Sequence, residues 1–205
     1  MSDQDFFEYR FEARFDDKDC PVVVLEGPLP DRLKGLSLIH QDLNQVDAIL
    51  GELGACESES VARQKGLLFG ALVLYGKCYT EARGRKTRLK PESIFKHAPV
   101  KLRVRHDWLM RLRHEFVAHG GEAQEEQLKL LLVLRPEGEE KGIVSLMGHG
   151  ATAHSLDIKL IEESQEAVRF AAKKVSAQIE ALQRNLLKKF DNEGLEWAYQ
   201  NAVKD

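Results

Sequence analysis

The chain has 205 residues, of which 43% are hydrophobic and 31% are charged, and its formal net charge is −3. This length and composition predict one soluble globular domain over residues 1–205 and exclude a low-complexity or disordered chain. The N-terminus carries no secretion signal and no apolar run is long enough to span a membrane, so we expect a cytoplasmic protein without a membrane partner.

The three cysteines, Cys20, Cys56 and Cys78, also indicate a reducing compartment. Their number is odd and no pair has the C-x-x-C spacing, which argues against a disulfide framework and against a zinc knuckle.

Residues 1–29 are predicted to form an N-terminal β-hairpin. Aromatic residues from Phe7 to Phe15 alternate with charged ones, which is the period of a strand. Residues 16–19 follow as a turn, and Val22–Leu25 as a second short strand. The aromatic stripe is interpreted as a packing face.

Residues 30–121 are predicted to be helical and to contain the functional motif. Pro28 and Pro30 interrupt the chain, and Asp31 is placed to cap a helix that runs to about Leu53. A second helix is predicted from about residue 60 to residue 83. Two adjacent rows of this helix are apolar, so we expect it at the centre of the bundle.

Basic residues are concentrated between Arg83 and Arg113. This stretch holds eleven lysines and arginines against two acids, Glu92 and Asp107, a balance of +9 that leaves −12 for the rest of the chain. Such a block is typical of a phosphate-binding surface. Ion pairing with the acidic remainder of the chain is the alternative, and both interpretations stay open.

The next helix is predicted to begin near Val100 and to end at the double glycine Gly120-Gly121. Its leucines recur at helical spacing. At about 100° per residue, Arg113 and His119 fall inside the apolar arc, while His114 and Glu115 fall outside it. An inward-facing arginine and histidine require partners, a wet cleft or an interface.

A second hairpin is predicted over residues 127–149, where alternate leucines precede a charged turn. We expect it to pair with the N-terminal hairpin into one small sheet. A long helix follows over residues 157–190, with an apolar seam suited to the bundle and to a dimer contact. The apolar tail after Asp191 is predicted to dock on the bundle.

No metal or cofactor site is predicted. His149 and His154 lack a third ligand nearby, and the sequence shows no glycine-rich phosphate loop and no cluster of carboxylates. The order His114-Glu115 followed by His119 is not a zincin motif either, because that motif places its second histidine four residues after the first.

The run R-H-E-F-V-A-H, residues 113–119, resembles the signature of the HEPN superfamily: an arginine followed by a polar residue, with a histidine a few positions later near a helix end. The resemblance implies a small helical bundle, usually a dimer, in which Arg113 and His119 form a metal-independent ribonuclease site. The chain departs from some family toxins, which carry a modified tyrosine two residues after the histidine, because that position is Gly121.

The expected protein is therefore mainly α, a HEPN-like helical bundle with one or two small β-hairpins. It is expected to cleave RNA by attack of the 2′-hydroxyl, with Arg113 holding the phosphate, His119 transferring a proton and His114 assisting. The residues expected to attract the RNA backbone are Arg83, Arg85, Lys86, Arg88, Arg105 and Arg111.

The expected partners are RNA, a second copy of the chain facing the motif, and an antitoxin or another protein if the chain is a toxin or defence effector. Two alternatives stay open: a catalytically silent domain that binds nucleic acid or nucleotide, and a protein-interaction module. A structural role for the motif residues is also open: Arg113 would pair with a carboxylate or cap carbonyls, and His119 would only end its helix.

Overall fold

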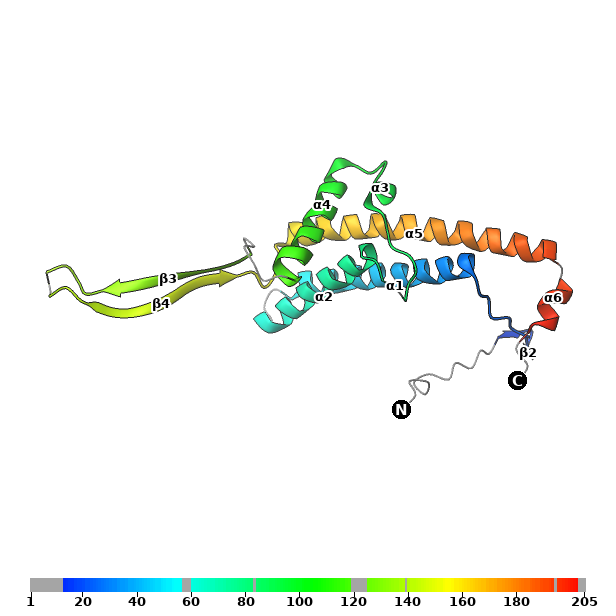
Figure 1. The fold of residues 1–205 in the computed structure, drawn as a ribbon, viewed down its shortest axis with the longest axis horizontal. Helices are drawn as coiled ribbons and strands as arrows, with labels where there is room; N and C mark the ends of the chain where they lie inside the picture. Colours follow the sequence, from blue (N-terminus) through cyan, green and yellow to red (C-terminus); the bar gives the residue numbers. More distant parts are fainter. Residues whose placement is uncertain are drawn as a thin grey trace.

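The computed structural model describes residues 13–56, 60–82, 84–118, 125–138, 140–193 and 195–202. Two long helices, α1 (Pro28–Ala55) and α5 (Ile158–Glu193), lie side by side and run in opposite directions (Figure 1). Helices α2 (Val61–Tyr79) and α4 (Val100–Arg111) pack on this pair. The predicted fold class, a helical bundle with two small antiparallel hairpins, is confirmed.

Helix α1 begins at Pro28, three residues before the predicted cap. Gly27 precedes it with a φ of 113°, and the Asp31 backbone N–H donates to the Gly27 carbonyl at 2.9 Å. The first four N–H groups of a helix have no partner inside it, so Pro28 and Pro30 fit the first turn. Asp31 lies in that turn but makes no side-chain cap.

Helix α2 begins after Ser60, whose hydroxyl accepts from the Arg63 backbone N–H at 3.3 Å. It ends at Tyr79, earlier than predicted, because Thr80 is extended and its hydroxyl donates to the Gly76 carbonyl at 2.8 Å. As predicted, this helix supplies much of the core. Its buried hydrophobic residues are Leu68, Ala71, Leu72, Tyr75, Cys78 and Tyr79.

The motif helix changes its geometry before the motif. A short helix α3 (Pro91–Ile94) precedes α4, and α4 continues directly into a π-helical segment, η1 (Leu112–Ala118). In a π-helix the hydrogen bonds join residues five apart instead of four. The motif from Arg113 to Ala118 therefore lies on a wider turn than the predicted α-helix, with Leu112 and Phe116 buried.

The predicted seam of α5 is buried along most of its length, with Val168, Ala171, Val175, Leu182 and Leu186 in the core. Helix α6 (Leu195–Gln200) follows. It is less docked than predicted: Leu195 and Tyr199 are exposed, and Trp197 stacks on Phe190 with 5.7 Å between the ring centroids.

In the part of the chain that the structure describes, two hairpins form two separate sheets, which contradicts the prediction of one joint sheet. The first pairs β1 (Arg14–Phe15) with β2 (Lys18–Asp19), and its turn at residues 16–17 has positive φ at both positions. Residues 22–25, predicted as a strand, form none, and residues 7–12 of the predicted first strand lie outside the described part. The second hairpin pairs β3 (Glu126–Leu134) with β4 (Ile143–Thr152) and extends away from the helices (Figure 1).

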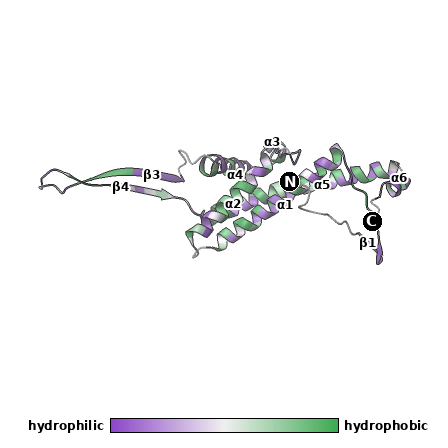
Figure 2. Cartoon of the chain, turned by 60° about the horizontal axis from the view of Figure 1, so that its bottom comes forward, coloured by the Kyte–Doolittle hydropathy of each residue, from purple (hydrophilic) through white to green (hydrophobic). Residues whose placement is uncertain are grey.

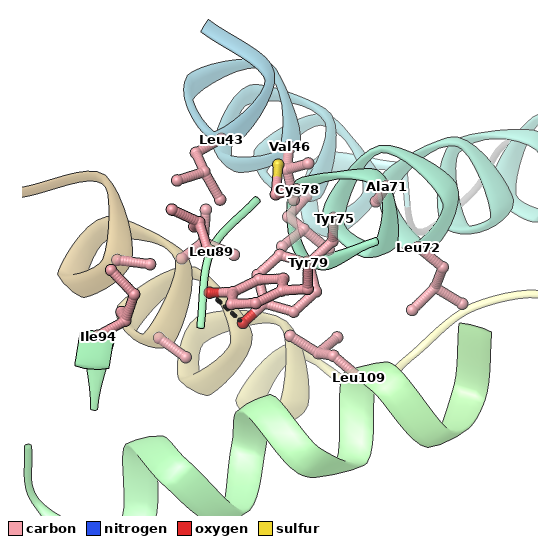
Figure 3. Close-up of a cluster of buried hydrophobic side chains, with 14 of the residues drawn as sticks. Leu43, Val46, Ala71, Leu72, Tyr75, Cys78, Tyr79, Leu89, Ile94 and Leu109 are labelled. Carbon is pink, nitrogen blue, oxygen red and sulfur yellow. Dashed lines mark hydrogen bonds between the residues drawn. The ribbon is translucent and has the colours of Figure 1, made fainter. Parts of the chain in front are cut away.

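A buried aromatic cluster joins α2 to α4 through His106. Figure 3 shows its two tyrosines, Tyr75 and Tyr79, in one buried cluster with Leu109 of α4. The Tyr75 hydroxyl lies 2.8 Å from Nδ1 of His106 and 3.5 Å from the Tyr79 hydroxyl. Both the Tyr75 and the His106 side chain are almost completely buried. Because burial disfavours its charged form, the pKa of His106 falls to about 4.

This buried histidine makes stability dependent on pH. In the unfolded chain a histidine titrates near its usual pKa of about 6.5, so between pH 6.5 and 4 the unfolded state binds more protons and acidification favours it. We expect the wild type to lose about 2 kcal/mol more of its free energy of unfolding from pH 7 to pH 5 than His106→Phe loses. Urea unfolding at each pH measures this difference, with exposed His97→Phe as the control. Identical pH profiles for wild type and His106→Phe would contradict the assignment.

Candidate functional site

Arg113 lies in η1, half-buried, with its stem against Gly76 of α2. A Cβ atom at Gly76 would lie 2.8 Å from Cγ, 3.0 Å from Cδ and 3.1 Å from Nε of Arg113. The arginine therefore occupies the space that the missing side chain leaves. Within the described ranges, no carboxylate forms an ion pair with Arg113.

The neighbours of Arg113 have the orientation that the sequence predicted. His114 and Glu115 are exposed, and Phe116 is buried with its ring 5.1 Å from that of Phe69, edge to face. The prediction that His119 turns inward falls outside the described residues. The described motif helix ends at Ala118, one residue before His119. The structure therefore places Arg113 and His114 but not His119.

Arg111 is bound by two acids. Its guanidinium donates to the Glu125 carboxylate at 2.7 and 3.3 Å and to the Glu115 carboxylate at 3.1 Å. Because Arg111 donates these hydrogen bonds, the pKa of Glu125 is lowered, and the pKa of Arg111 is raised for the same reason. Glu125 immediately precedes β3, so this pair joins the motif helix to the root of the long hairpin.

Arg105 is likewise paired within the protein. Its guanidinium donates to the Glu163 carboxylate of α5 and lies 4.7 Å from the centroid of the Trp108 ring. Its Nε is buried with no hydrogen-bond partner in the described structure. These contacts pack α4 against α5. They also engage the side chain of Arg105, which the sequence analysis predicted to bind the RNA backbone.

Arg85 is the most buried of the predicted phosphate ligands. It donates to the Asp42 carboxylate of α1, and Lys77 of α2 lies 3.4 Å from the same carboxylate. Both Arg85 and Asp42 are less than a tenth exposed. Next to them, burial and then Asp42 raise the pKa of the Cys78 thiol to about 12, so this cysteine stays protonated and is a poor nucleophile.

The other members of the basic loop are more accessible. Lys86 and Arg88 are exposed, and the Lys86 amine donates to Asp31 at 2.8 Å, which raises the pKa of that lysine. Arg83 lies outside the described residues. Of the predicted phosphate-binding side chains that the structure describes, Lys86 and Arg88 therefore lie on the surface, while Arg85 is enclosed.

A hollow of about 440 Å³ lies at the root of the long hairpin. Glu125, His154 and Ser155 are among its lining residues, and the Glu125 carboxylate is the one that binds Arg111. His149 lies on β4 and does not line it. Among the described residues no group of three or more His, Cys, Asp or Glu side chains is arranged to hold a metal ion.

Sequence reasoning missed three kinds of residue around the motif. The first is the contact between Gly76 and Arg113: the spacing of glycines in α2 indicated close helix contact there, but not the partner. The second is the set of acidic partners of the basic block, Asp42, Glu125 and Glu163. The third is the buried pair Tyr75 and His106. The acidic partners and the buried pair gave no local signal, because each of these residues pairs with one that a different segment supplies.

No described helix combines the length and the apolar character that crossing a membrane requires. This finding agrees with the hydropathy of the sequence over the same residues.

The contrast between Arg85 and Arg88 can be tested by stability. Arg85→Ala removes one partner of a buried pair, so we expect it to lower the free energy of unfolding by about 2–4 kcal/mol. Arg88→Ala alters an exposed side chain three residues later and should change it by less than about 0.5 kcal/mol. Urea denaturation of both variants measures the difference. Equal values for the two variants would contradict the buried pairing of Arg85 with Asp42.

Comparison of this chain with protein-family models, with curated proteins and with solved structures gave no match. The function is therefore inferred from the residues of the chain and from their geometry.

Proposed function

We propose that the chain is a metal-independent endoribonuclease of the HEPN type, with Arg113 and His119 as its catalytic residues. The observation that carries the proposal is the environment of Arg113. Arg85, Arg105 and Arg111 are each neutralised by a carboxylate of the same chain. Arg113 is half-buried beside Gly76, and no described carboxylate pairs with it.

An arginine in this position suits a phosphate. Its guanidinium presents two parallel N–H groups that match the non-bridging oxygens of a phosphodiester, and the packed stem reduces the entropy lost on binding. A group that is fixed before the reaction stabilises the charge that develops in the transition state better than a mobile one. Gly76 supplies this fixation, because it lets α2 approach the stem of Arg113.

The proposed reaction is a transesterification. The 2′-hydroxyl oxygen of the RNA attacks the adjacent phosphorus and loses its proton, and the bond from phosphorus to the 5′-oxygen breaks while that oxygen takes up a proton. The products are a 2′,3′-cyclic phosphate and a 5′-hydroxyl. His119 would transfer one of these protons, since imidazole titrates near neutral pH. Exposed His114 would orient the phosphate or share the proton transfer.

The RNA backbone would approach over the exposed part of the basic loop, where Lys86 and Arg88 lie. Arg111 could contribute only by exchanging the Glu115 and Glu125 carboxylates for phosphate. The proposal includes the role of a toxin or defence effector with an antitoxin or other protein partner, and a homodimer in which two motifs face one another. The competing proposals are a silent domain that binds nucleic acid or nucleotide, and an interaction module.

Cleavage of RNA separates these proposals. We expect wild-type protein to cleave RNA in the presence of EDTA and to leave 2′,3′-cyclic phosphate ends. His119→Ala should slow cleavage at least about 100-fold, because proton transfer by a placed side chain contributes that much. Its free energy of unfolding should stay within about 0.5 kcal/mol of the wild type. Exposed His97→Ala is the matched control and should cleave normally.

A substrate with a 2′-deoxy sugar at the scissile position should stay intact, because the nucleophile is absent. Two results would contradict the mechanism: cleavage that EDTA abolishes and magnesium restores, or equal cleavage of RNA and DNA. A His119→Ala protein that fails to fold would favour a structural role for this histidine.

The contact of the Arg113 stem with Gly76 gives a second prediction, which can be tested by a variant that leaves the motif residues unchanged. Gly76→Ala places a methyl group against Cγ and Cδ of Arg113, so the guanidinium must move, and a displacement of about 1 Å can cost up to about 100-fold in rate. Gly70→Ala, on the same helix, meets no atom within 4 Å and is the control.

We expect Gly76→Ala to lower kcat/KM at least about tenfold. Gly70→Ala should leave kcat/KM unchanged and raise the free energy of unfolding by up to about 1 kcal/mol, because alanine favours helix over glycine. Unfolding curves and single-turnover cleavage assays provide the two measurements. Equal rates for both variants would mean that catalysis does not depend on the position of Arg113.

A further inference from the structure

The hairpin β3–β4 extends away from the helical bundle as an arm (Figure 1). Every residue of its two strands is exposed except Val133, which is half-buried. Figure 2 nevertheless shows much of β3 in the green of hydrophobic residues. A two-stranded hairpin is at best marginally stable alone in water and needs further strands or a packing partner. The arm therefore has the composition of a buried element in an exposed position.

The pairing register separates the two faces of the arm. Residues opposite one another in an antiparallel pair share a face, and alternate residues of a strand do so as well. One face, called the leucine face below, is formed by Leu128, Leu130, Leu132 and Leu134 of β3 with Leu146 of β4. The other face carries Lys129 opposite His149, Leu131 opposite Met147 and Val133 opposite Ser145, so it mixes polar and apolar side chains.

The leucine face is smooth as well as apolar. Gly150 and Gly148 stand opposite Leu128 and Leu130, and the Leu128 side chain lies over both glycines. A Cβ atom at Gly150 would lie 3.0 Å from Leu128 Cδ1, and one at Gly148 would lie 3.3 Å from the same atom. Because the glycines carry no side chains, a second surface can approach the leucines closely.

The size of the leucine face fits a protein interface. Its five leucines are 55–72% exposed. At roughly 100 Å² of open surface for each such side chain, the face offers on the order of 500 Å² per copy. Two such faces together would bury about 1,000 Å², which is the lower limit expected of a biological interface.

The charges of the arm decide among occupants. A membrane is disfavoured, because Arg135, Glu137, Glu140 and Lys141 are exposed at the tip that would enter it. RNA is disfavoured, because the leucine face offers no cation between Glu126 and Leu134. Glu126 is exposed at the root and Lys141 at the tip, so an acid and a base that can pair in an antiparallel stack lie at opposite ends of the arm.

We propose that the arms of two copies of this chain stack leucine face on leucine face, in opposite directions about a two-fold axis. Such an arrangement brings the same patch from both chains together and sets Glu126 of each copy against Lys141 of the other. The leucines of the two hairpins then form a small two-layer sandwich. The inference goes beyond the proposed ribonuclease, because it concerns the arm and requires no residue of the motif. It is an alternative to the dimer of facing motifs, since stacking in opposite directions places the two motifs at opposite ends of the paired arms.

Light scattering and sedimentation of the full chain test the stacking. We expect the wild type to have the mass of two chains, and the double variant Leu130→Glu with Leu132→Glu to raise the dimer dissociation constant at least about tenfold. Ser145→Glu adds the same side chain to the other face and should leave the dimer intact. A wild type that stays monomeric at every concentration would overturn the proposal, and so would a double variant that dimerises normally.

Charge reversal tests the direction of the stack without adding a charge to the leucine stripe. Glu126→Lys and Lys141→Glu should each weaken the dimer, and the variant with both changes should recover it, because every pair is then reversed. Recovery fails if the arms stack in the same direction, which would overturn the antiparallel arrangement.

Two further measurements separate this proposal from its competitors. A monomeric wild type that sediments with anionic vesicles, while the double leucine variant does not, would assign the arm to a lipid surface and overturn the proposal. His119→Ala should dimerise as the wild type does, so loss of RNA cleavage and loss of the dimer are independent outcomes.

Discussion

The buried hydrogen bond between Tyr75 and His106 holds the motif helix on the centre of the bundle. It joins α2 to α4 at 2.8 Å, inside a cluster that also contains Tyr79 and Phe95. The next residue of α2, Gly76, lies against the stem of Arg113. Two consecutive residues of α2 therefore fix two points of the motif helix: a polar contact at His106 and a steric contact at Arg113.

The π-helical segment carries the contacts of the motif with α2. Leu109 and Leu112 remain buried on either side of the change from α4 to η1, and Phe116 is buried one turn later. The Phe116 ring packs edge to face on Phe69 of α2, and the stem of Arg113 lies against Gly76. Such wide turns occur frequently at functional sites, and this one coincides with the Arg-His motif.

Most of the fold follows from local patterns in the sequence. The three-four spacing of apolar residues predicts α1, α2 and α5, because a helix buries one stripe wherever it packs. Alternating leucines likewise predict β3. Val22–Leu25 shows where this reasoning fails: branched residues favour a strand, but no partner strand pairs with them, and isolated strands are not stable.

The site was less predictable than the fold. Helical periodicity was enough to place Arg113 inward and His114 outward. Periodicity did not predict the ion pairs of the basic block, because Asp42 lies 43 residues before Arg85 and Glu163 lies 58 residues after Arg105. No regular spacing in the sequence indicates an ion pair between distant segments. The alternation in β3 also indicates an apolar face without showing whether the same chain covers it.

The ion pair Arg111–Glu125 connects the motif helix to the arm. Arg111 lies two residues before Arg113, and Glu125 immediately precedes the arm, so one ion pair positions the arm root beside the motif helix. The pair is partly buried, with Glu125 18% exposed, and is therefore less screened than a surface pair. Its carboxylate also keeps Arg111 from acting as a free phosphate ligand. An approaching phosphodiester would compete with Glu125 for Arg111, so binding at the motif and the attachment of the arm share one guanidinium.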